Sequence, residues 1–245
     1  MTSLIKIIIS LLAALLFTSC AFDVNFGQMR GNGNVITEDL RITENFNEIS
    51  AANGWEVIVE KGSEVSVVLE ADENLVDAAE IYVKNNTLKI YCESNISRAT
   101  SKKVFVTYVD DLTSIRASSG ANLITKQVLK GDNLSLDVSS GGHIRTEAIV
   151  RKIETDVSSG GKINITGSTE SLNADVSSGG SIYADKLKAK YAVANASSGG
   201  VIDLYVTDKL QARASSGGDI DYWGDPKEVD KPKKSVSGGS VTSKQ

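Results

Sequence analysis

Side chains that could act as nucleophiles, acids or bases are common in this sequence, but they do not form a catalytic pattern. The only histidine, His143, directly follows Gly141-Gly142. Serine catalysis needs a histidine base beside the nucleophile and a third group that orients the base, and the glycine-flanked nucleophile elbow is absent from the sequence. The corresponding corners elsewhere hold four different residues, Lys162, Ser181, Val201 and Asp219. We therefore expect no Ser-His-Asp triad.

Carboxylates do recur at one position of a repeated segment. They stand two residues before the first serine of consecutive Ser-Ser-Gly turns, as Asp137, Asp156 and Asp175, and Asn195 takes the position in the next copy. Such a ladder could bind a cation, but the Gly-Asp nonapeptide of calcium-binding β-rolls is absent. Carboxylates about 5 Å apart repel by only about 1 kcal/mol in water. A solvated ladder with no metal is therefore the favoured interpretation, with cation binding as the alternative.

The segment that positions these residues is a repeat. Six Ser-Ser-Gly turns begin at Ser118, Ser139, Ser158, Ser177, Ser197 and Ser215, in steps of 21, 19, 19, 20 and 18 residues. A degenerate copy follows at Val236-Ser237-Gly238-Gly239, and an upstream copy aligns Ile49 to Gly54 with Ile115 to Gly120. A fixed period of this length is typical of solenoids and other repeat architectures.

Apolar residues keep fixed places around each turn. One column precedes the serines, as Val138, Val157, Val176, Ala196 and Ala214, and another follows them, as Ile144, Ile163, Ile182, Ile202 and Ile220. The alternation predicts strands. A unit of about 20 residues cannot bury its own apolar face, but copies stacked about 4.8 Å apart form one continuous core. The sequence thus predicts an all-β fold, a single-stranded parallel β-helix-like solenoid with rungs of 18–21 residues.

The rest of the chain is less regular. We expect a signal peptide at 1–19, a lipid-anchored tether at 20–30 and an irregular N-terminal part of the solenoid at 31–111. The regular repeats are expected at 112–224, and a C-terminal cap or tail at 225–245. In the irregular part Asn85-Asn86 predicts a turn, and Asp72 is expected to cap a helical turn. This insert is expected to cover one end of the solenoid, where bare strand edges invite aggregation.

The first residues predict export. Lys6 precedes an apolar run that is too short to span a bilayer, which needs about 20 apolar residues, and Thr18-Ser19 then lead into Cys20. This ending resembles a bacterial lipobox, whose cysteine becomes the lipidated first residue of the mature protein. An ordinary signal peptide with an incidental cysteine is the alternative. Only Cys92 then remains, so no internal disulfide forms, and its alternation with Leu88 and Ile90 predicts a buried small hydrophobe.

Charge excludes one class of partner. The chain has 26 basic and 31 acidic residues, a formal net charge of −5. Nucleic-acid binding requires a basic surface that neutralises phosphates. We therefore expect no nucleic-acid partner.

Several motifs together resemble one protein family. These are the lipobox, Gly31 to Val35, Phe46 to Ser50 before a glycine turn, and the repeated Ser-Ser-Gly-Gly-x-Ile units such as Gly161-Lys162-Ile163. The combination resembles the head GIN domain family of putative auto-transporter adhesins over roughly residues 31–224. The resemblance implies a β-helix-like fold in a secreted or lipid-anchored protein of Bacteroidota, and no particular chemistry.

The favoured function is therefore a noncatalytic cell-envelope lipoprotein, without a cofactor, that presents a β-helical surface to a glycan or an envelope protein. It is expected at the outer membrane, on either the periplasmic or the surface face. If strands run straight past the inward isoleucines, Tyr183, Tyr205 and Trp223 face outward on one side and are the candidate ligand-binding residues. The alternatives are a structural module that self-associates into homo-oligomers, and a β-helix polysaccharide-active enzyme, which the short connections between rungs disfavour.

Overall fold

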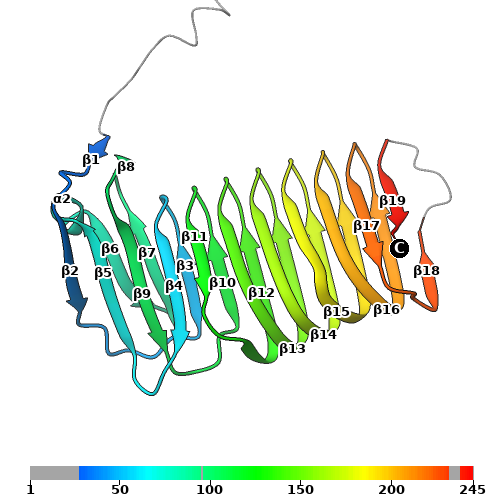
Figure 1. Cartoon of the computed structure of the whole chain (residues 1–245), viewed down its shortest axis with the longest axis horizontal. Coiled ribbons are helices and arrows are strands. Elements are labelled where there is room, and N and C mark those ends of the chain that lie inside the picture. The colour runs from blue at the N-terminus through cyan, green and yellow to red at the C-terminus, as the bar shows by residue number, and fades with distance from the viewer. Residues whose placement is uncertain (1–27, 95, 232–237, 245) are drawn as a thin grey trace, which may run out of the picture.

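The protein is a β-solenoid, seen in a computed structural model that describes residues 28–94, 96–231 and 238–244 (Figure 1). It makes about six turns with rungs about 20 residues apart. The expected all-β parallel solenoid is therefore confirmed. The described residues contain no helix long and apolar enough to cross a membrane.

Strands of the regular part follow one another rung by rung. They are β10 (Ser114–Ala117), β11 (Asn122–Thr125), β12 (Leu129–Val138), β13 (His143–Val157), β14 (Lys162–Val176), β15 (Ser181–Ala196), β16 (Val201–Ala214), β17 (Asp219–Trp223), β18 (Glu228–Asp230) and β19 (Ser240–Ser243). Each pairs in parallel with the strand one rung away. The long strands bend midway, so a rung has two faces, joined by the Ser-Ser-Gly turn at one edge and by the bend at the other (Figure 1).

The two predicted apolar columns form the core. The five isoleucines from Ile144 to Ile220 are fully buried, and the column from Val138 to Ala214 is at most 8% exposed. The ladder register sets Ile144 against Ile163 and Ile163 against Ile182, so like residues stack on like. Because β-branched side chains suit a pleated surface with apolar neighbours, this stacking buries every copy at once.

The turn needs left-handed backbone at two successive residues. In each copy the second serine has φ between 48° and 50°, and the glycine after it has φ between 70° and 76°. A hydrogen bond closes the turn, as from the Gly142 amide to the Ser139 carbonyl at 2.9 Å. This is the pattern of a type I′ turn, so the second serine adopts the same left-handed conformation as the glycine that follows it.

The glycine that follows is needed for a different reason. A Cβ at Gly142 would lie 2.5 Å from the Ala117 carbonyl oxygen on the neighbouring rung. The other copies are similarly crowded, whereas the preceding glycine, Gly141, has open space around it. In the two rungs nearest the N-terminal end this position holds Trp55 and Ala121, both fully buried.

The N-terminal part mixes parallel and antiparallel pairing. Its elements are β1 (Met29–Arg30), β2 (Val35–Leu40), β3 (Glu48–Ala51), β4 (Glu56–Lys61), β5 (Ser66–Asp72), α2 (Glu73–Val76), β6 (Ala79–Lys84), β7 (Thr87–Cys92), β8 (Ile96–Arg98) and β9 (Lys102–Tyr108). The first rung, β3 and β4, pairs in parallel with β10 and β11, and sets Ile49 against Ile115 as the repeat alignment predicts. Beyond it, β7 and β9 pair in parallel with β3 and β4, whereas the pairs β2–β5, β5–β9 and β6–β7 are antiparallel. Asn85 and Asn86, both with positive φ, make the two-residue turn of the β6–β7 hairpin.

Asp72 occupies the N-cap position of α2, but the expectation that its side chain caps the helix is wrong. Its buried carboxylate instead accepts hydrogen bonds from the backbone amides of Gly33, Thr100 and Ser101, each at 2.9 Å. These bonds hold the first described strands against the end of the solenoid, and they hold the pKa of Asp72 below its usual value, the Ser101 amide most strongly.

At the other end the ladder continues beyond the regular repeats. β18 pairs with β16 and β19 with β17, both in parallel, so these parts of the expected cap or tail form strands of a further rung. Gly238 has the positive φ of the other turns, while Val236 and Ser237 lie outside the described residues.

Candidate ligand-binding groove

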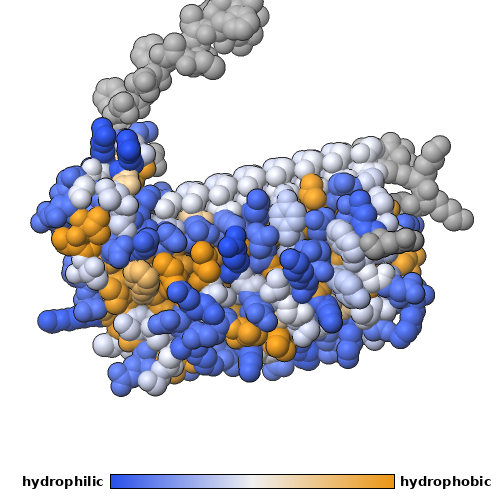
Figure 2. Space-filling view, viewed as in Figure 1, coloured by the Kyte–Doolittle hydropathy of each residue, from blue (hydrophilic) through white to orange (hydrophobic). Residues whose placement is uncertain are grey.

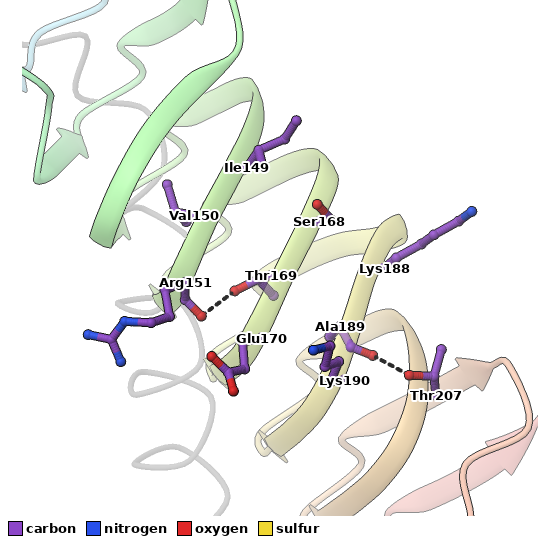
Figure 3. A pocket seen from close by; sticks show the side chains of 10 residues that line it. All are labelled: Ile149, Val150, Arg151, Ser168, Thr169, Glu170, Lys188, Ala189, Lys190 and Thr207. Carbon is purple, nitrogen blue, oxygen red and sulfur yellow. Dashed lines mark hydrogen bonds between the residues drawn. The ribbon is translucent and has the colours of Figure 1, made fainter.

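A groove of about 450 Å3 crosses the outer side of the bend (Figure 3). We call it the bend groove. Four successive rungs line it, with three residues each from β13, β14 and β15 and one from β16. They are Ile149, Val150, Arg151, Ser168, Thr169, Glu170, Lys188, Ala189, Lys190 and Thr207. The groove therefore runs along the solenoid axis rather than into the core.

Alternation at the bend gives the groove two rims and a floor. The middle residues Val150, Thr169 and Ala189 are at most 6% exposed, so their backbone forms the floor. The residues before them form the first row, Ile149, Ser168 and Lys188, which the ladder places in register. The residues after them form the second row, Arg151, Glu170 and Lys190, on the other side of the floor (Figure 3).

Two threonine hydroxyls join the rungs beneath the groove. Thr169 Oγ1 donates to the carbonyl of Arg151 at 3.0 Å, and Thr207 Oγ1 donates to the carbonyl of Ala189 at 3.5 Å. Each bond links a rung to the rung before it (Figure 3). The floor is therefore held in place before any ligand arrives.

Charge in the bend groove is mainly positive. Three cations and one carboxylate line it. Arg151 forms an ion pair with Asp132 at 3.4 Å, whereas Lys188 and Lys190 pair with no acid among the residues that the structure describes. Two cations on opposite rims of one rung are therefore free to meet an anion.

The predicted aromatic site is only partly brought together. Trp223 pairs in register with Tyr205, and Tyr205 with Lys188, so these two aromatics extend the first row. Tyr183 instead pairs with Asn164 and Asp203, in a different column. The assumption of straight strands was wrong because the register shifts between Ala184 and Lys188. Tyr205 therefore aligns with Ser168 and Ile149 rather than with Glu147 and Thr166.

Sequence analysis did not single out the exposed aromatic Tyr191. Tyr191 is 48% exposed, and Val193, two residues later on the same face, is 39% exposed. Both lie on the face that precedes the turns. Tyr191 is in register with Ser171 on the rung before it and with Lys209 on the rung after it. Their outward direction could have been inferred by counting back from the buried Ala196.

The acidic ladder is in register as predicted, and the carboxylate at each end has a side-chain partner. Asp137 forms an ion pair with Arg116 at 3.2 Å, and Asp175 accepts a hydrogen bond from Asn195 Nδ2 at 2.8 Å. Asp156 lies between them, where desolvation and then its two acidic neighbours raise its pKa. The described residues hold no group of three His, Cys, Asp or Glu side chains suited to a metal ion.

The remaining predicted residues lie apart from the groove. His143 Nε2 lies 2.7 Å from Asn164 Oδ1, in register with Lys162 on the face that follows the turns. Cys92 is free and buried, as predicted. Cys20 and the signal segment lie outside the described residues.

A second surface of interest lies near the N-terminal end. Val68, Phe105, Ile58 and Ile124 are neighbours in register on an outward face. We call them the N-terminal apolar patch; Figure 2 shows apolar side chains gathered over β5, β9, β4 and β11. Phe105 is 38% exposed.

Comparison with known proteins identifies relatives. The sequence profile of the family described as "Putative auto-transporter adhesin, head GIN domain" matches residues 45–226. No curated protein matches the chain. Similar solved structures include a putative adhesin from Bacteroides fragilis, with a TM-score of 0.79, 21% identity, and coverage of 88% of this chain and 99% of that one. A putative adhesin from Parabacteroides merdae has a TM-score of 0.71, 22% identity, and coverage of 89% and 100%. A putative lipid binding protein from Parabacteroides distasonis has a TM-score of 0.65, 20% identity, and the same coverage.

Proposed function

This chain belongs to the head GIN domain family of putative adhesins, and from this premise we propose that it is a noncatalytic, lipid-anchored protein of the cell envelope. Its rigid solenoid presents the bend groove and the adjoining Tyr205–Trp223 column to a ligand outside the cell membrane. The lipid on Cys20 supplies attachment, and the stacked rungs supply a surface that does not change shape on binding.

The observation that carries this proposal is the continuity of the groove with the two aromatics. Lys188, Tyr205 and Trp223 stand on three successive rungs in one row. Rungs are about 4.8 Å apart, so this row offers charge and aromatic area within about 10 Å. Aromatic side chains provide large contact area at little entropic cost, and they are enriched among residues that dominate binding.

A noncatalytic role is consistent with the groove's chemistry. Glycoside hydrolysis normally requires two carboxyl groups on either side of the scissile bond. Among the residues that line the bend groove, Glu170 is the one carboxylate. We therefore assign binding rather than cleavage to this surface.

A ligand array tests the binding role. The full chain in detergent is applied to arrays of envelope glycans and proteins beside a Tyr205→Ala, Trp223→Ala variant. Binding to a defined ligand that the double variant loses, and that a Tyr183→Ala control keeps, supports the proposal. Tyr183 is a matched control because it is also an outward aromatic but lies in another column. Equal binding by all three proteins contradicts it.

The lipid anchor has its own test. Cys20→Ser should move the protein from the membrane fraction to the soluble fraction, because an acyl chain rather than the fold holds it. The melting temperature should not change. Persistent membrane association of this variant would refute the anchor.

The N-terminal apolar patch favours a second candidate function, a structural envelope module that self-associates. Exposed contiguous apolar residues are typical of interaction surfaces. Light scattering of the full chain over a range of concentrations distinguishes the two. Growth of oligomers with concentration, abolished by Phe105→Ser, supports self-association. A monomer at all concentrations rules it out.

A further inference from the structure

We propose that the bend groove binds an unbranched acidic polysaccharide that lies along the solenoid axis. Its anionic groups rest between Lys188 and Lys190, and its next sugar rings stack on Tyr205 and Trp223. This inference rests on the proposed function and adds to it the chemical class of the ligand.

The shape of the groove suits a linear polymer. It is open to solvent, it crosses four rungs, and its floor is backbone that repeats from Val150 to Thr169 to Ala189. A polymer of equal units laid along the axis therefore meets a similar floor at each step. A protein partner would normally seat aromatic or arginine anchors in deep desolvated pockets, and this shallow floor provides none.

The positive charge of the groove favours an anionic ligand. The chain as a whole is acidic, with a net charge of −5. Around the groove the excess is reversed, and the two lysines without ion-pair partners flank Ala189 from opposite rims (Figure 3). The nearby acid Asp208 is paired with Lys227 at 2.5 Å, and Lys227 most strongly, with a smaller contribution from Lys190, lowers the pKa of Asp208. A carboxylate or sulfate over Ala189 would receive charge-assisted hydrogen bonds from both ammonium groups once the Lys188 side chain, which extends away from the floor in Figure 3, turns inward.

The aromatic column selects a sugar among acidic polymers. Tyr205 lies on the rung directly after the one that holds Lys188 and Lys190, and Trp223 lies on the next rung. The apolar face of a pyranose ring can cover such side chains while its hydroxyls stay in water. An acidic peptide or an anionic lipid surface would use the lysines but does not present apolar sugar-ring faces at these regular spacings.

Calorimetry with defined polymers tests the ligand class. The full chain with Cys20→Ser, which lacks the lipid and needs no detergent, is titrated with polygalacturonate, a linear polyuronate, with dextran, a neutral glycan, and with vesicles of anionic phospholipid. We expect polygalacturonate to bind with an affinity that falls as salt is added, because the contacts are between charges. Tighter binding of dextran or of the vesicles overturns the proposal, as does the absence of polygalacturonate binding.

Variants locate the site. Lys188→Ala with Lys190→Ala should weaken polygalacturonate binding about tenfold or more, because the charge-assisted contacts to the polymer are lost, and the corresponding double arginine variant should retain it. The control is Lys84→Ala with Lys89→Ala, which removes the same charge from β6 and β7. Equal loss in the control shows a nonspecific charge effect and refutes the site. If polygalacturonate fails but the array finds another ligand that needs Tyr205 and Trp223, the proposed function stands and this inference falls.

Discussion

The two glycines of each turn are needed for different reasons: Gly141 has a positive φ, and Gly142 packs closely against the neighbouring rung. Substitutions at these two adjacent positions test the two reasons separately. Gly142→Ala places a Cβ 2.5 Å from the carbonyl oxygen and 2.7 Å from the carbonyl carbon of Ala117. That oxygen accepts the rung-to-rung hydrogen bond from the Ser139 amide at 3.1 Å. The backbone of one rung must therefore move away from the next.

The cost can be worked from these contacts. Overpacking costs about 1–3 kcal/mol, and loss of the ladder hydrogen bond adds about 1 kcal/mol. Reduced freedom of the unfolded chain returns about 0.4–1 kcal/mol. The net loss of stability is about 2 kcal/mol, which lowers the melting temperature of a chain of this size by about 4–8 °C.

Gly141→Asn is the matched control. Its φ of 72° strains most side chains, but asparagine tolerates this conformation, and no atom lies within 4 Å of the added Cβ. We expect a loss of about 0.5 kcal/mol or less. Both variants are compared with the unaltered chain by thermal melting followed by circular dichroism. A Gly142→Ala protein as stable as the parent, or a Gly141→Asn protein that melts lower than Gly142→Ala, would refute this account of the turn.

Three further predictions concern the core and two carboxylates. Ile163→Asp should abolish cooperative melting, because it buries an unpaired charge in a stacked column; an unchanged melting curve contradicts the core assignment. Asp156→Asn should stabilise the protein by about 0.5 kcal/mol at neutral pH and low salt. Because the folded-state pKa of Asp156 is raised, its charge destabilises the fold above the ordinary value of 3.8, and the gain should vanish below that pH. Asp137→Asn, which breaks the pair with Arg116, should show no such gain. Asp72→Asn should destabilise the protein at neutral pH, since a lowered pKa contributes stability that is present above 3.8 and is lost as pH falls through the folded-state pKa. Urea denaturation at pH 7 and pH 3 measures both carboxylates, and effects of the same sign for Asp72 and Asp156 would contradict the reasoning.

Much of the fold could be predicted from the sequence because each rung repeats the same turn and the same alternation of apolar residues. The column from Ile144 to Ile220 is fixed by alternation around an invariant turn, so its burial needs no knowledge of distant contacts. The pairing of Ile49 with Ile115 followed in the same way, from the likeness of two turns. The antiparallel strands did not, because the direction in which a strand pairs depends on tertiary packing rather than on its own alternation.

The binding surface was harder to foresee than the core. Counting from Ile202 gives Tyr205 its outward direction, but not its neighbours, since β15 holds three more residues than β16 between Ala184 and Lys188. The shift does interrupt the alternation of β15, where Asp185-Lys186 and Lys190-Tyr191 are consecutive residues that are not buried, but such a break does not say which residue of the next rung each side chain faces. The bend groove depends on which residues stand side by side across rungs, and this register became visible only in three dimensions.

The bend groove is assembled from one triplet of residues per rung, so its length is set by the number of repeats. Duplicating Ser158 to Val176 would insert one complete rung, with its own turn, column residues and triplet, and would leave both ends of the solenoid unaltered. Loss of a rung would shorten the surface by about 4.8 Å in the same way. The valence of this protein toward a polymer can thus change in whole steps through recombination between repeats, without a new fold or a new core.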